Sequence, residues 1–157
     1  MKNKTIHAGP GIFAIVASRY NGRYVAGMLE AAQATLRKAG AQVRVVRVPG
    51  AYEIPIVAAK LARRSSEIEE ISAIICLGVI LRGETAHAAH IGQAVSQGLM
   101  RIQLDFEVPV IHEVLLLENE EQAKKRCLDA RHNRGIEAAR TALEMANVLW
   151  SIHSLKA

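Results

Sequence analysis

Four apolar runs along the chain predict the strands of one sheet. Residues 11–17 and 73–81 are continuous hydrophobic runs, as is typical of central strands buried on both faces. Residues 108–117 predict another strand, with Pro109 near its start. Residues 42–48 carry arginines between valines, which indicates an edge strand. Because these runs alternate with helical segments, the pattern predicts an α/β fold with a parallel sheet covered on both faces.

The segments between these runs place hydrophobic residues three and four positions apart, as one face of a helix requires. The first predicted helix covers residues 23–39. Thr85 is the predicted N-cap of the helix after the third strand, and Asn119 that of a short helix after the fourth. The last helix follows a break at residues 133–135 and carries a hydrophobic stripe that ends in Trp150.

The length of the chain suits a single domain over residues 1–157 with a substantial core. Residues 1–10 are polar and would fray alone, so we expect an N-terminal arm that could pair with a neighbouring subunit. The net charge of +5 suits anionic ligands, but no basic run is interleaved with aromatic residues. Nucleic-acid binding is therefore a weak hypothesis.

The two cysteines, Cys76 and Cys127, have no spacing typical of a metal site. We interpret them as buried or inert thiols in a reducing compartment and expect no metal site. The sequence shows no signal peptide and no apolar run near the ~20 residues of a membrane span. We therefore expect a cytoplasmic protein.

Three predicted loops follow the first three strands and carry the polar side chains of interest. They supply Tyr20 and Asn21, then residues 51–53, then residues 83–87. Because the carboxyl ends of parallel strands share one edge, these loops should meet where open α/β sheets bind ligands. A helix N-terminus at that edge favours anions. Each residue alone would be weak support for a site, but together they predict one.

Six blocks of sequence resemble the 6,7-dimethyl-8-ribityllumazine synthase family of riboflavin biosynthesis. They are SRYN, VPGAYEIP, LGVILRGETAH, ENEEQAKKR, NRG and ALEMANVL, in this order along nearly the whole chain. The resemblance implies a flavodoxin-like three-layer α/β/α sandwich with a four-stranded parallel sheet. It also implies pentamers, or multiples of them, with active sites between adjacent subunits.

The resemblance further implies a reaction. The family condenses 5-amino-6-(D-ribitylamino)uracil with 3,4-dihydroxy-2-butanone 4-phosphate, releases phosphate and water, and uses no metal or organic cofactor. This is the penultimate step of riboflavin biosynthesis. The expected partners are thus small molecules and copies of the chain, with riboflavin synthase as a further candidate and no nucleic acid or membrane.

By the same resemblance, His87 is the residue that transfers protons. The pyrimidine and ribityl groups would contact a larger set: Tyr20, Asn21, Ala51, Tyr52, Glu53, Ile80, Leu81 and His112. The phosphate would be bound by Glu84, Thr85 and Arg126. Arg134 is a further candidate.

The sequence departs from the family pattern at three of these places. Ala89 stands where the family often has an acidic residue two positions after the histidine. His112 replaces a common phenylalanine that a neighbouring subunit contributes, and Arg134 replaces a common lysine. His90 lies one turn after His87, and we interpret it as part of a solvated helix face.

Two other functions compete with this synthase hypothesis. A response-regulator receiver domain needs carboxylates for Mg²⁺ at the strand ends, but the first strand ends in Ser18 and Arg19. A shell or flavin-storage protein that has lost activity is disfavoured by an intact set of site residues: Tyr20, Glu53, His87 and Arg126. Ala89 and the histidine at position 112 keep that second alternative open.

Overall fold

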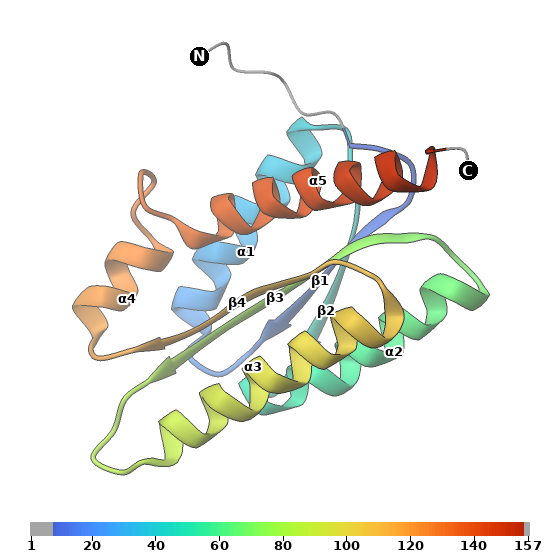
Figure 1. The fold of residues 1–157 in the computed structure, drawn as a ribbon. Helices are drawn as coiled ribbons and strands as arrows, with labels where there is room; N and C mark the ends of the chain where they lie inside the picture. Colours follow the sequence, from blue (N-terminus) through green and yellow to red (C-terminus); the bar gives the residue numbers. More distant parts are fainter. Residues whose placement is uncertain (1–7, 156–157) are drawn as a thin grey trace.

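The computed structural model describes residues 8–155 and has three layers, with a parallel sheet between two layers of helices (Figure 1). Its strands within these residues are β1 (Ile12–Ser18), β2 (Gln42–Val48), β3 (Ile71–Leu81) and β4 (Val110–Leu117). They pair in the order β2-β1-β3-β4, and each neighbouring pair is parallel. This arrangement is of the flavodoxin-like type, and the predicted α/β sandwich with a four-stranded parallel sheet is confirmed.

Helices cover both faces of this sheet. In the described residues they are α1 (Gly22–Lys38), the 3₁₀ turn η1 (Ala51–Glu53), α2 (Ile54–Glu67), α3 (His87–Phe106), α4 (Glu120–Cys127) and α5 (Arg134–His153). Helices α1, α4 and α5 pack on one face, and α2 and α3 on the other (Figure 1). Because side chains alternate along a strand, Phe13 and Ile15 of β1 join the first core, and Ala14 and Val16 the second.

Two asparagines start the helices of the C-terminal part. Asn119 is the N-cap of α4, as predicted, and its side chain accepts the N–H of Gln122 at 2.9 Å. Asn133 caps α5 by accepting the N–H of Gly135 at 2.8 Å. The predicted break at 133–135 is therefore too long, since α5 already begins at Arg134.

Gly135 brings α5 against α1 at close range. A Cβ atom at this position would lie 2.0 Å from the carbonyl oxygen of Met28. Only glycine fits this contact without moving the two helices apart. The side chain of Asn133 supports the same junction by donating to the carbonyl oxygen of Gly27 in α1 at 3.2 Å. It also donates to the carbonyl oxygen of Cys127, the last residue of α4, at 2.7 Å.

Strand boundaries differ slightly from the prediction. Strand β3 begins at Ile71, two residues earlier than expected, because Ile71 pairs with Ile12 of β1. Strand β4 begins at Val110, two residues later, after Pro109, which has no N–H for a strand ladder. Most of the predicted N-terminal arm, residues 1–7, lies outside the described residues.

Both cysteines are free and buried, as expected. Burial raises the pKa of each thiol, that of Cys127 to about 11. Neither is therefore a reactive thiolate near neutral pH. Among residues 8–155, none of the helices is long and apolar enough to cross a membrane.

Candidate active site

The loops that follow β1, β2 and β3 surround a cavity of about 940 Å³ at the carboxyl edge of the sheet. Its volume is typical of a small-molecule site. Residues from all three loops line it, including Tyr20, Asn21, Ala51, Tyr52, Glu53, Ile80, Leu81, Thr85 and His87. The parallel strand order therefore brings nine of the predicted site residues into one cavity.

The first loop is shaped by Asn21. Its φ of 53° lies in the left-handed region, which asparagine tolerates better than most residues. The Asn21 side chain donates to the carbonyl oxygen of Val79 at 2.8 Å, which ties the loop to the end of β3. The N–H of Tyr20 donates to the carbonyl oxygen of Pro49 at 3.0 Å, while its side chain remains 74% exposed. Tyr20 thus offers a free aromatic surface beside the cavity.

The second loop forms the 3₁₀ turn before α2. One carboxylate oxygen of Glu53, Oε2, accepts the N–H of Gly50 at 2.9 Å. Among the described residues, Oε1 of Glu53 has no hydrogen-bond partner. Tyr52 is 64% exposed at the same wall. The carboxylate is therefore oriented by the backbone while keeping one oxygen available to a ligand.

The third loop places His87 as the first residue of α3, at the cavity. The predicted N-cap, Thr85, is wrong by one position, because Ala86 precedes the helix with φ −69° and ψ −3°. Ala86 has no side-chain oxygen to cap the helix. The Thr85 hydroxyl still accepts the N–H of His87, at a long 3.4 Å.

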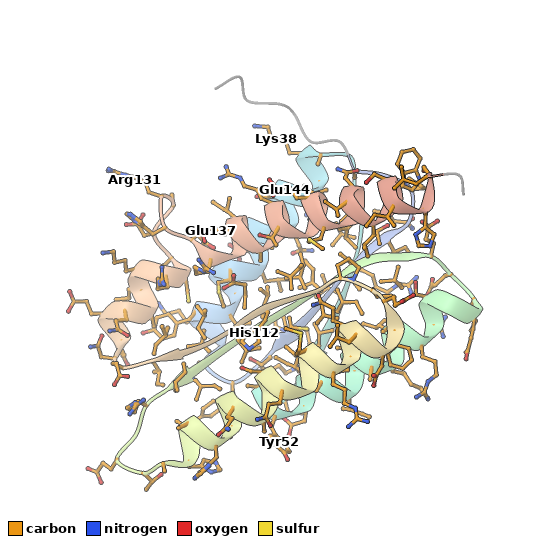
Figure 2. All side chains as sticks on the ribbon, in the orientation of Figure 1. Lys38, Tyr52, His112, Arg131, Glu137 and Glu144 are labelled. Atoms are coloured by element: carbon orange, nitrogen blue, oxygen red, sulfur yellow. The ribbon has the colours of Figure 1, made fainter. Side chains whose placement is uncertain are left out.

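Four predicted site residues do not line this cavity: Glu84, His112, Arg126 and Arg134. Glu84 is exposed. Arg126 lies on α4 in a separate hollow at the carboxyl end of β4, beside Gln122 and Lys125. His112 is on β4 (Figure 2), and its side chain reaches α3, where Nε2 lies 2.8 Å from the hydroxyl oxygen of Ser96. None of these four residues therefore contributes to the wall of this cavity.

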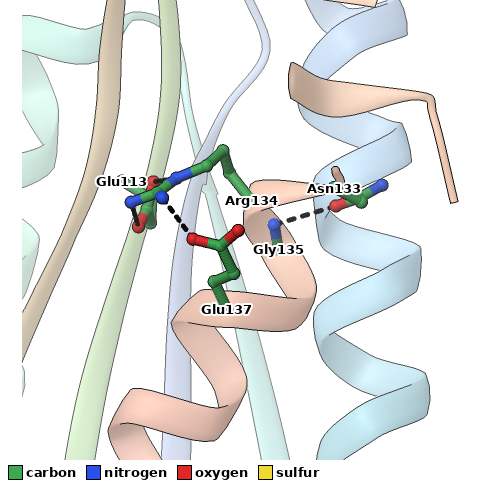
Figure 3. Close-up of polar contacts among 5 residues, drawn as sticks. All are labelled: Glu113, Asn133, Arg134, Gly135 and Glu137. Carbon is green, nitrogen blue, oxygen red and sulfur yellow. Dashed lines mark hydrogen bonds and ion pairs between the residues drawn. The ribbon is translucent and has the colours of Figure 1, made fainter. Parts of the chain in front are cut away.

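Arg134 is held by two carboxylates (Figure 3). Its Nε and Nη2 donate to Oε2 and Oε1 of Glu113 at 3.0 and 2.7 Å, and its Nη1 donates to the carboxylate of Glu137. Glu113 is only 4% exposed. Because the guanidinium fork is engaged by a buried carboxylate, its candidate role in binding a ligand is disfavoured.

Burial raises the pKa of the Glu113 carboxyl, and the Arg134 guanidinium opposes this shift. The folded chain therefore binds this proton more tightly than the unfolded chain. The stability gained from this tighter proton binding is fully present below the ordinary glutamate pKa of about 4.3 and is lost as pH rises through the raised pKa of Glu113.

We expect the difference in the free energy of unfolding between the wild type and Glu113→Gln (wild type minus variant) to fall as pH rises from about 4. Urea unfolding of both proteins across this range measures the difference, and a rising difference would reverse the predicted sign.

Several residues that line the cavity were not predicted. They are Gly50, Val79, Ala88, His90, Ile91 and Ala94, whereas Gly83 belongs to the predicted third loop. The i,i+3 spacing of His87 and His90 was a usable signal, since it places both on one face of α3. The only sequence signal for the ion pair between Glu113 and Arg134 was Glu113 itself, an acidic residue within an apolar strand.

In residues 8–155, no group of three or more His, Cys, Asp or Glu side chains could hold a metal ion.

Known proteins are similar to this sequence over most of its length. The family profile described as 6,7-dimethyl-8-ribityllumazine synthase matches residues 12–150, which include the four strands and the cavity loops. The 6,7-dimethyl-8-ribityllumazine synthases of Stenotrophomonas maltophilia strains R551-3 and K279a are each 44% identical over 140 residues. These matches cover 87% of this chain and 88% of each relative. With the parallel sheet and the cavity at its carboxyl edge, they show that the chain belongs to the 6,7-dimethyl-8-ribityllumazine synthase family.

Proposed function

We propose that this chain catalyses the formation of 6,7-dimethyl-8-ribityllumazine at the cavity described above. The substrates are 5-amino-6-(D-ribitylamino)uracil and 3,4-dihydroxy-2-butanone 4-phosphate, and the reaction releases phosphate and water. The observation that carries the proposal is one cavity, in a member of this family, lined by Tyr20, Glu53 and His87 from three separate loops.

The pyrimidine substrate binds on the side of the first two loops. Tyr20 has the exposed ring needed to stack on a planar heterocycle. The free Oε1 of Glu53 accepts a hydrogen bond from a ribityl hydroxyl, next to Ala51 and Tyr52. Ile80 and Leu81, at the end of β3, meet the uracil edge through their main chain.

The phosphate substrate binds at the start of α3. The backbone amides of Glu84 and Thr85 and the Thr85 hydroxyl suit an oxyanion beside a helix N-terminus. The Glu84 side chain is exposed, so its carboxylate can remain in water, away from the phosphate. Arg126 from a neighbouring subunit supplies the cation, because its own side chain lies outside the cavity of its subunit.

His87 transfers the protons of the condensation. Imine formation, loss of phosphate and ring closure require protons to move between the substrates, and an imidazole can do this near pH 7. Holding the two substrates side by side supplies most of the rate enhancement. The expected contribution of His87 to kcat is therefore near the low end of the range for a general acid–base residue.

The active site is shared in a ring of five subunits. His112 and Arg126 lie outside the cavity of their own subunit, which supports a site to which a neighbour contributes them. The flank of α3 next to His112 exposes Met100 and Leu104, at 55% and 68%, as an uncovered apolar face would before assembly. Each subunit is a single cytoplasmic domain, and riboflavin synthase is a candidate partner.

An assay for lumazine formation tests this function directly. The purified chain is mixed with the two substrates, and the product is followed by its absorbance. We expect turnover without added metal or cofactor. A correctly assembled protein that binds the pyrimidine but forms no lumazine would instead fit the storage or shell alternative.

Replacing Arg126 with alanine should weaken binding of the phosphate substrate. Loss of a charge-assisted contact costs about 1.5 kcal/mol at an exposed site, which is roughly a tenfold increase in KM. Steady-state kinetics with each substrate varied in turn measure this. Lys125→Ala, on the same exposed turn of α4, is the matched control. An increase in KM confined to the ribitylaminouracil would contradict the phosphate assignment.

A further inference from the structure

The hydroxyl of Ser96 forms two short contacts that fix the direction of its proton. Its Oγ lies 2.8 Å from the carbonyl oxygen of Gly92 and 2.8 Å from Nε2 of His112. Two oxygen atoms at this distance repel unless a proton lies between them, and the Gly92 carbonyl has none to give. Ser96 must therefore donate to Gly92, as serines in helices often do to the residue four positions earlier.

The single proton of the Ser96 hydroxyl is therefore engaged by the carbonyl oxygen of Gly92. The contact with His112 also needs a proton, and it can come only from the imidazole. His112 accordingly carries its proton on Nε2 and donates it to Ser96. In the neutral ring, Nδ1 is left with an unshared lone pair, and it has no hydrogen-bond partner among residues 8–155. The tautomer follows from this hydrogen-bond network.

The surroundings place this nitrogen at an uncovered surface. His112 is exposed on the edge strand β4, and the apolar flank of α3 with Met100 and Leu104 continues from Ser96. An edge strand beside an exposed apolar flank is where another subunit would pack. Nδ1 of His112 would then face a ligand held by that neighbour.

We infer that Ser96 is a positioning residue that holds His112 in its Nε2–H form, so that Nδ1 accepts a hydrogen bond from the neighbour's pyrimidine substrate. This rests on the proposed function. The donor is an amine, a ring N–H or a ribityl hydroxyl. A phenyl ring at this position could stack but could not accept such a bond, so the histidine adds a polar contact.

Solid-state ¹⁵N spectra of histidine-labelled, fully assembled protein test the tautomer. The signals of His112 are identified by their absence in His112→Phe. We expect a pyrrole-type Nε2 and a pyridine-type Nδ1 in the wild type and in Ser96→Thr, which keeps the hydroxyl. Ser96→Ala should give a mixture of tautomers. Ser151→Ala is the control, because Ser151 is an exposed serine that donates within α5, to the carbonyl oxygen of Val148. A protonated Nδ1 in the neutral wild-type ring would overturn the assignment.

Kinetics test the contact with substrate. Ser96→Ala should raise KM for the ribitylaminouracil roughly two- to tenfold with little change in kcat, as loss of one neutral hydrogen bond predicts. The same change made in His112→Phe should have no further effect. An equal effect in both backgrounds, or none in either, would overturn the inferred contact. If the wild type makes no lumazine, the proposed function fails and the substrate contact with it, while the spectra still decide the tautomer.

Discussion

Replacing Arg134 with alanine is expected to lower the free energy of unfolding by about 3 kcal/mol, the low end of the cost of breaking a buried ion pair. The variant would leave the Glu113 carboxylate, 4% exposed, without its two hydrogen bonds. The low end applies because the Arg134 side chain is itself 28% exposed. Urea unfolding at neutral pH measures the change.

Two further variants separate this effect from general damage to α5. Arg140→Ala removes an exposed arginine from the same helix and should change stability by less than about 0.5 kcal/mol. A double variant, Arg134→Met with Glu113→Leu, replaces the pair by apolar side chains and should recover most of the loss. A loss below about 1 kcal/mol in Arg134→Ala would show that the pair is no more than a surface ion pair.

Replacing His87 with alanine is expected to lower kcat about 100-fold, near the low end for a general acid–base residue. The substrates would still be held together by the rest of the cavity, so KM for each should change little. His132→Ala is the matched control, since His132 is an exposed histidine that pairs with Asp129 away from the cavity. An unchanged kcat in His87→Ala would remove this residue from the proposed mechanism.

Much of the fold follows from local patterns in the sequence. The apolar runs of β1 and β3 predicted central strands, and the arginines of β2 predicted an edge strand, because burial on both faces leaves no place for a charge. Asn119 was readable as a cap because its hydrogen bond spans only three residues. The loops could be placed at one edge because parallel strands end together.

The contacts that could not be predicted join residues that are far apart in the sequence. Glu113 and Arg134 are 21 residues apart, and only the packing of α5 against β4 brings them together. From the sequence alone, Arg134 was therefore a candidate site residue and not a partner of Glu113. The pairing of Ser96 with His112 likewise depends on how α3 lies on β4. Arg126 lines a hollow separate from the cavity, and the proposed function accounts for this by a site shared between subunits.

A mixing experiment with two impaired variants tests the shared site most directly. His87→Ala and Arg126→Ala subunits are co-expressed with different tags, mixed oligomers are purified, and lumazine formation is measured at a low concentration of the phosphate substrate. If each site takes His87 from one subunit and Arg126 from the next, random mixing leaves about a quarter of the sites with both residues. We expect an activity near a quarter of the wild type, well above that of either variant alone. An activity equal to the average of the two variants would contradict a site shared between subunits.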